Sequence, residues 1–215
     1  MEAAAAGATL VQVLDLAAVF VFALTGGLSA SRAQLDPVGF IFVAAVTGLG
    51  GGTLRDLILD RTPVFWVANP YYLLVAAIAA LLVFFTAHLL MSRLRAIYWL
   101  DALALGMAVP AGLAVAVGLG ADWPIAITMG IITASFGGIA RDVICNEVPV
   151  VLQEGELYIT AAFAGGAAGM AALAVTGSPV TMALVCGFTA VIIRAAALAF
   201  NLRLPRYKPR PPRER

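Results

Sequence analysis

The sequence predicts an all-α membrane protein whose seven transmembrane helices form two inverted three-helix repeats followed by a seventh helix. The first observation is composition, because 62% of the 215 residues are hydrophobic and 12% are charged. The mean hydropathy of +1.00 is far above the range of a soluble domain. The second observation is a series of apolar stretches long enough to cross a bilayer as helices. The third is an internal repeat.

Seven apolar stretches predict the helices in order. They cover residues 9–31, 37–59, 68–91, 97–118, 124–145, 157–176 and 179–200. Tryptophans and tyrosines stand near the ends of several stretches, as in the aromatic belts of membrane proteins. The connecting loops are short and no soluble domain is expected. The tail is rich in proline and basic residues, and we expect it to be disordered and held near anionic lipid headgroups.

The second half of the chain repeats the first half with a shift of 86 residues and no gap. The segment Gly51-Gly52-Thr53-Leu54-Arg55-Asp56 returns as Gly137-Gly138-Ile139-Ala140-Arg141-Asp142, and Asp15, Pro63 and Tyr72 return as Asp101, Pro149 and Tyr158. A unit with three crossings starts on one side of the membrane and ends on the other, so its copy must be inverted. We therefore divide the chain into a first repeat (1–91), an inverted second repeat (92–177), a seventh helix (178–201) and a basic cytoplasmic tail (202–215).

Basic residues set the orientation of the chain in the membrane. With the N-terminus outside, the loop and tail lysines and arginines are cytoplasmic, except Arg61. The cytoplasmic set is Arg32, Arg93, Arg95, Arg203, Arg206, Lys208, Arg210, Arg213 and Arg215. We therefore predict a multi-pass protein with its N-terminus outside and its C-terminus in the cytoplasm. The start has no basic segment, so a cleaved signal peptide is not expected.

Two glycine motifs lie inside predicted spans, and each lies past the midplane of the membrane along its helix. They are Gly50, Gly51 and Gly52 in the second span, and Gly137 and Gly138 in the fifth. A glycine weakens a helix by about 1 kcal/mol relative to alanine, so we expect each helix to kink or open at its motif. The alternative is that these glycines only permit close helix packing. The charged residues that follow both motifs favour the first interpretation.

An arginine and an aspartate follow each glycine motif. These residues are Arg55 and Asp56 in the first copy, and Arg141 and Asp142 in the second. An ionised group in hydrocarbon costs roughly 3 kcal/mol or more unless it is paired or wetted. Neighbouring side chains point about 100° apart on a helix, so each arginine needs a partner elsewhere.

The partners are expected on the first and fourth spans. Asp15 lies at nearly the depth of Arg55, and Asp101 at nearly the depth of Arg141. We predict two equivalent ion pairs, which leave the aspartates of the two motifs free to meet a cation or a substrate amine. The alternative is a purely architectural network that fixes the helices in place.

The remaining polar residues predict no second site. Arg194, in the seventh span, is expected to extend to the inner surface. Ser29 and His88 both fall near inner span ends, but Ser29 lacks the glycine pattern of a serine hydrolase, so an enzyme is not expected. Cys145 and Cys186 are isolated and have no metal-ligand spacing. We expect no cofactor, no metal and no nucleic-acid partner.

The doubled Gly-Gly-x-x-Arg-Asp motif, in a chain of three, three and one spans, resembles the prokaryotic branch of the trimeric intracellular cation channels. In each copy a proline segment follows, Pro63-Val64-Phe65-Trp66 and Pro149-Val150-Val151. The resemblance implies a homotrimer in a prokaryotic inner membrane, with a pore in each protomer that conducts monovalent cations, chiefly potassium. It assigns the glycines to the helix kinks and the motif charges to the pore. The second copy has Phe136 where the first has Gly50.

Two other functions compete with the channel. Bacterial relatives are also labelled as glycine transporters, and inverted repeats with broken helices serve transporters as well as channels. A transporter would bind a small zwitterion through the arginines and aspartates of the two motifs. The third possibility is a membrane scaffold that transports nothing. We favour the potassium-permeable channel, with membrane lipids and further copies of the chain as its partners.

Overall fold

The computed structural model describes residues 2–153 and 157–205, and the described part is helical without strands. In chain order the helices are α1 (Glu2–Arg32), α2 (Pro37–Ile58), α3 (Phe65–Ala68), α4 (Tyr71–Thr86), η1 (Ala87–Leu89), α5 (Arg93–Gly118), α6 (Trp123–Ile144), η2 (Val150–Leu152), α7 (Tyr158–Thr176) and α8 (Pro179–Phe200). Seven segments are long and apolar enough to cross a membrane, and the ends of these segments, such as Thr9–Arg32 and Tyr71–Leu89, lie within four residues of the predicted spans. The predicted tail lies outside the described residues from residue 206 onward.

Local sequence signals set several helix ends. Asp36 caps α2, because its carboxylate accepts a hydrogen bond of 2.7 Å from the Gly39 amide, and a proline takes the first helical position. Ser92 caps α5 in the same way, which is why this helix begins four residues before the predicted span. Helix α7 ends at Gly177, which has a φ of 64°, a value that favours glycine.

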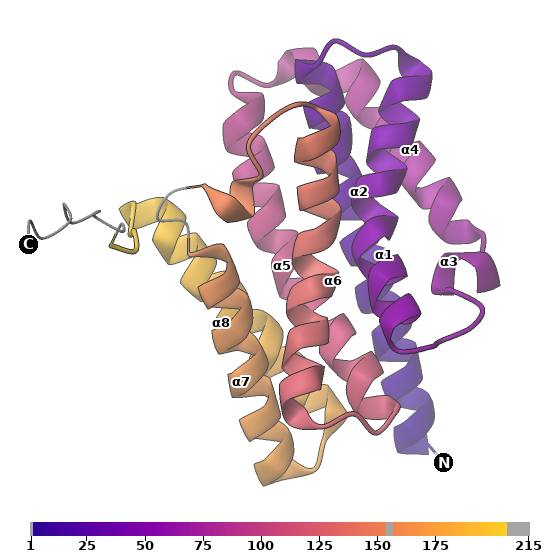
Figure 1. Ribbon diagram of the computed structural model, residues 1–215, viewed down its shortest axis with the longest axis vertical. Helices are drawn as coiled ribbons and strands as arrows, with labels where there is room; N and C mark the ends of the chain where they lie inside the picture. Colours follow the sequence, from indigo (N-terminus) through magenta and orange to yellow (C-terminus); the bar gives the residue numbers. More distant parts are fainter. Residues whose placement is uncertain (1, 154–156, 206–215) are drawn as a thin grey trace, which may run out of the picture.

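The two three-helix repeats have opposite directions, which confirms the predicted fold class. In Figure 1, α1 rises from the marked N-terminus, α2 descends and α4 rises, whereas α5 descends, α6 rises and α7 descends. Helix α1 packs against α2, α4 and α5, and α5 packs against α6 and α8. Helices α2 and α6, the two that carry the motifs, pack directly against each other.

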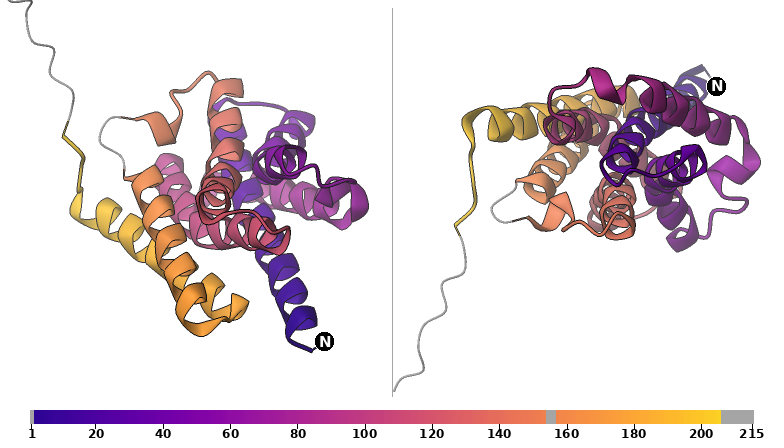
Figure 2. Two further views of the ribbon diagram at one scale, coloured as in Figure 1. Left: turned by 60° about the horizontal axis from the view of Figure 1, so that its bottom comes forward. Right: turned by 90° about the horizontal axis from the view of Figure 1, so that it is seen from above.

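The second repeat departs from the symmetry because the seventh spanning helix enters its packing. Helix α4 packs closely on α1, but the corresponding place on α5 is taken mainly by α8, and α7 packs mostly on α8. Figure 2 shows α7 and α8 together at one side of the bundle. The core accordingly has two clusters of buried side chains: one joins α1, α2 and α4, and the other joins α1, α5, α6, α7 and α8.

Helices α2 and α6 are each continuous through their glycines. The helical assignment runs without interruption from Pro37 to Ile58 and from Trp123 to Ile144. The continuous helices contradict an opening at the glycine motifs in the conformation described, whereas a kink at the motifs stays a prediction. The glycines instead permit the close approach of α2 and α6.

Candidate functional site

The candidate site is the crossing of α2 and α6 together with one charged cluster on either side of it. A Cβ atom on Gly51 would overlap the carbonyl oxygen of Thr133, and a Cβ atom on Gly137 would overlap that of Thr47. The two backbones therefore touch at this crossing, as in other close helix contacts in membranes. The Thr47 and Thr133 hydroxyls donate hydrogen bonds of 2.6 Å to carbonyls of their own helices.

The other motif glycines lie beside the crossing. Gly52 packs against the Phe65 ring, because a Cβ atom there would lie 2.6 Å from Cε1. At Gly50 the nearest atoms to an added Cβ belong to Gly137 and Phe136, at 3.6 and 3.9 Å. At Gly138 the one neighbour within 4 Å is Arg141 Nη2, at 3.8 Å. The crossing thus depends on one glycine from each motif.

The first charged cluster consists of Asp15, Arg55, Asp56 and Arg61. The structure brings Asp15 and Arg55 together, with Arg55 Nη1 3.0 Å from Asp15 Oδ1. Arg55 Nε also donates to Asp56 Oδ1 at 2.8 Å, and its guanidinium lies over the Phe65 ring. Asp15, Arg55 and Asp56 are buried. Among the described residues, Arg55 Nη2 has no hydrogen-bond partner.

The second charged cluster consists of Asp101, Arg141 and Asp142, joined by Thr25. Arg141 binds Asp101 with both terminal nitrogens, at 2.9 and 3.0 Å, and its Nε donates to Asp142 Oδ1 at 2.7 Å. Arg141 Nη1 also donates to the Thr25 hydroxyl of α1 at 2.7 Å. Each guanidinium nitrogen of Arg141 therefore has an acceptor. This bidentate arrangement is stronger than the single contact between Arg55 and Asp15.

The structure corrects the interpretation of Asp56 and Asp142 as free groups. Asp56 Oδ2 accepts a hydrogen bond of 2.9 Å from the Phe65 amide at the start of α3. Asp142 Oδ2 accepts one of 2.8 Å from the Val150 amide at the start of η2. Each aspartate thus binds its neighbouring arginine with one oxygen and holds a folded-back loop with the other. An oxygen that satisfies a buried amide is costly to remove.

Neither charged cluster carries an excess of positive charge. The first combines two arginines with two aspartates, and the second combines one arginine with two aspartates. An uncompensated arginine would repel a cation at close range. The carboxylates remove this obstacle at both ends of the crossing.

A hydrated route between α2 and α6 is not open in this conformation. A cavity of about 10 Å³ lies beside the first cluster, lined by residues that include Asp15, Gly48, Gly52 and Thr133. That volume accommodates about one water molecule. Beyond this cavity, the α2 and α6 backbones are in contact and leave no space for water between them.

Arg194 is placed differently from the sequence-based expectation. It is fully buried, and its guanidinium lies 5.4 Å from the centre of the Tyr158 ring. Tyr158 in turn donates to the carbonyl of Ala134 on α6 at 2.8 Å. The expected extension of Arg194 to the inner surface is therefore wrong, and this residue belongs to the packing of α6, α7 and α8.

The remaining candidate groups form no further site. Ser29 Oγ has no hydrogen-bond partner among the described residues, and His88 is exposed on η1. Both cysteines are free, and no group of metal-ligating side chains is found in the described part of the chain. Burial, and next the Glu147 carboxylate, raise the pKa of the Cys145 thiol, which lies just beyond α6. This cysteine is therefore protonated near neutral pH.

Both a family model and a bacterial relative match most of the chain. A family model described as "Glycine transporter" matches twice, over residues 12–88 and 98–174. The UPF0126 inner membrane protein YadS of Escherichia coli is 38% identical over 203 residues, which cover 92% of this chain and 96% of the relative.

Two solved structures have the same architecture. The TRIC trimeric intracellular cation channel orthologue from Rhodobacter sphaeroides is 47% identical, with a TM-score of 0.85, over 90% of this chain and 100% of that one. A second, from a study of conductance through TRIC cation channels, is 26% identical with a TM-score of 0.83, over 93% of this chain and 98% of that one.

Proposed function

The chain belongs to the TRIC cation channel family, whose sequence model is described as a glycine transporter, and on this premise we propose that it is a potassium-permeable channel of the inner membrane. Each protomer contains its own pore, which passes between α2 and α6 and is closed in this conformation. The protomers assemble as a homotrimer, as the name of the trimeric Rhodobacter sphaeroides orthologue states for that protein. The N-terminus is outside and the C-terminus is in the cytoplasm.

The observation that carries this proposal is the pair of charge-compensated clusters at either end of the α2–α6 crossing. Both arginines are buried and bound by carboxylates, so the route between them is neutral or negative. Ion pathways in membranes are the common reason for retaining such costly groups. In the proposed orientation, the first cluster lies at the outer mouth and the second at the inner mouth.

Opening requires α2 and α6 to separate at Gly51 and Gly137, where their backbones now touch. The second charged cluster also joins the two repeats, because Arg141 on α6 donates to Thr25 on α1, and this contact breaks when the repeats separate. Asp15 and Asp101 would then face the widened route and attract cations. The glycines would expose backbone carbonyls, which are ligands for potassium in other channels.

A transporter of glycine or another small amino acid is the second candidate. Arg55 Nη2 is a buried donor without a partner among the described residues, and a substrate carboxylate is the group that would satisfy it. Asp15 beside it would accept a hydrogen bond from the substrate ammonium. Against this candidate, the adjoining cavity of about 10 Å³ is too small for an amino acid without a rearrangement.

Flux into liposomes containing the purified protein separates the two candidates. The channel predicts passive uptake of radiolabelled rubidium, a potassium analogue, that depends on membrane potential and does not saturate at millimolar concentration. The transporter predicts saturable uptake of labelled glycine. Glycine uptake without rubidium uptake would contradict the proposal.

A further inference from the structure

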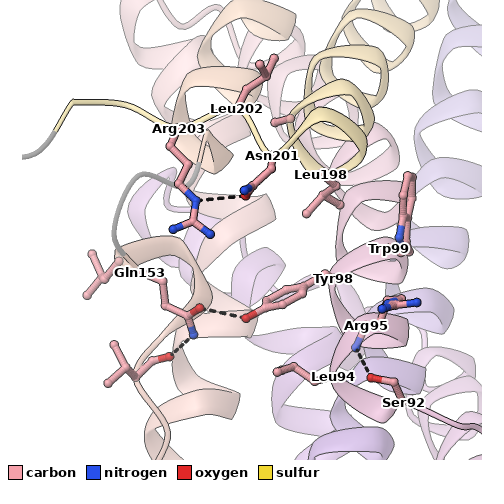
Figure 3. Close-up of a pocket in the computed structure, with 13 residues that line it drawn as sticks. Ser92, Leu94, Arg95, Tyr98, Trp99, Gln153, Leu198, Asn201, Leu202 and Arg203 are labelled. Atoms are coloured by element: carbon pink, nitrogen blue, oxygen red, sulfur yellow. Dashed lines mark hydrogen bonds between the residues drawn. The ribbon is translucent and has the colours of Figure 1, made fainter.

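A polar pocket of about 850 Å³ lies away from the α2–α6 crossing, between the start of α5 and the end of α8. Figure 3 shows Arg203 and Asn201, from the end of α8, on one side of the opening and Arg95 and Trp99, from α5, on the other. The floor includes Tyr98, whose hydroxyl donates to Gln153 at 2.9 Å. All these elements lie at the end of the bundle that the basic residues predict to be cytoplasmic.

We propose that this pocket binds the phosphate-bearing headgroup of an anionic phospholipid from the inner leaflet. The two residues with a charged side chain in its lining are both arginines, Arg95 and Arg203. Neither forms an ion pair with a carboxylate in the described part of the chain, and Arg203 Nε donates only to the Asn201 amide oxygen, at 3.0 Å. Arginine binds phosphate strongly, through two parallel hydrogen bonds.

The rest of the lining fits a lipid rather than a small soluble anion. Apolar side chains border the arginines and offer a wall for acyl chains; they include Leu94, Leu198 and Leu202. Trp99 is 45% exposed, as expected for an aromatic ring at headgroup depth. The volume is within the range of pockets for ligands much larger than phosphate.

The internal repeat does not account for this pocket. In the register of the repeat, Thr9 corresponds to Arg95, and α8 has no counterpart in the first half of the chain. One end of the bundle therefore carries the pocket, and this is the end that faces the anionic leaflet in the predicted orientation. The binding proposal does not depend on whether the protein conducts ions.

The pocket shares a wall with the loop that covers the second charged cluster. Gln153 also donates to the carbonyl of Val148 at 3.0 Å, and the amide of Val150 in the same loop binds Asp142. A lipid bound here would therefore contact the loop whose Val150 amide binds Asp142, and would restrain the position of that loop.

Native mass spectrometry of the detergent-solubilised protein, titrated with phosphatidylglycerol or phosphatidylcholine, tests the proposal. We expect the first phosphatidylglycerol to bind at least about tenfold more tightly than phosphatidylcholine, the equivalent of one charge-assisted hydrogen bond. The double variant R95Q/R203Q should lose this preference. Arg32→Gln is the matched control, because Arg32 lies at the same end and pairs with Glu147 outside the pocket, and it should keep the preference.

Three outcomes would overturn the proposal. The first is equal binding of the two lipids by the unmodified protein, a result that requires no variant to fold. The second is a preference that survives in R95Q/R203Q or is lost equally in R32Q. In the third, inorganic phosphate raises the melting temperature of the unmodified protein but not of R95Q/R203Q, without any lipid preference. The pocket would then bind a soluble phosphate, and the lipid assignment would be wrong.

Discussion

Replacing Thr25 by valine tests whether the second charged cluster holds the proposed pore closed. The Thr25 side chain is fully buried, and its hydroxyl accepts from Arg141 Nη1 at 2.7 Å while donating to the Phe22 carbonyl at 2.8 Å. Valine has nearly the same shape and the same branching, so the substitution removes the acceptor with little change in packing.

The expected magnitude follows from the remaining contacts of the arginine. A hydrogen bond to a charged group contributes about 1.5–3 kcal/mol, and Arg141 Nη1 keeps its contact with Asp101 at 2.9 Å. The lower end of the range, about 1.5 kcal/mol, therefore applies. If the contact with Thr25 exists only in the closed conformation, its loss raises the ratio of open to closed channels by about tenfold.

Single-channel recording in planar bilayers measures this ratio directly. Thr25→Ser is the matched control, because serine keeps the hydroxyl, and it should resemble the unmodified protein. An open probability in T25V that stays unchanged, or that rises equally in T25S, would refute the assigned role of the contact.

Three further predictions concern the same region. Gly137→Ala should prevent assembly of the α2–α6 contact, because its Cβ would overlap a backbone carbonyl. Gly138→Ala should fold normally in size-exclusion chromatography, because its Cβ would make an ordinary van der Waals contact with Arg141 Nη2 at 3.8 Å. Asp142→Asn should lower the free energy of unfolding by about 2 kcal/mol through loss of a buried charged hydrogen bond, measured as a fall in melting temperature. Asp122→Asn is the control and should not lower the melting temperature, because Asp122 is an exposed cap residue whose side chain makes no capping hydrogen bond. Equal falls in the two variants would contradict the prediction. Maleimide labelling of Cys145 should be slow at neutral pH and accelerate as the pH rises beyond the ordinary thiol pKa, because burial raises the pKa of this group. Fast labelling at neutral pH would contradict the burial of this thiol.

The architecture could be predicted because its signals are local or repeated. Hydropathy alone locates the seven spanning helices, and the parity of a three-helix unit requires the inversion. The positions of Asp15 and Asp101 along the membrane normal also predict their contacts with Arg55 and Arg141. A buried charge needs an opposite charge at the same depth, and the sequence offers few others there.

The sequence did not reveal features that depend on tertiary contacts. Thr25 was missed because its counterpart in the second repeat is Ala111, so the internal repeat gives no signal for it. The capping roles of Asp56 and Asp142 depend on loops that fold back after α2 and α6. Arg194 is buried because α8 packs inside the second repeat, a departure from symmetry that hydropathy does not encode.

We propose that a cation pathway passes through each protomer between α2 and α6. The decisive measurement is the reversal potential of the current through purified protein in a planar bilayer that separates two potassium chloride concentrations. We predict discrete current steps that reverse at the potassium equilibrium potential. Electrically silent bilayers, or currents that reverse at the chloride equilibrium potential, would contradict a cation channel.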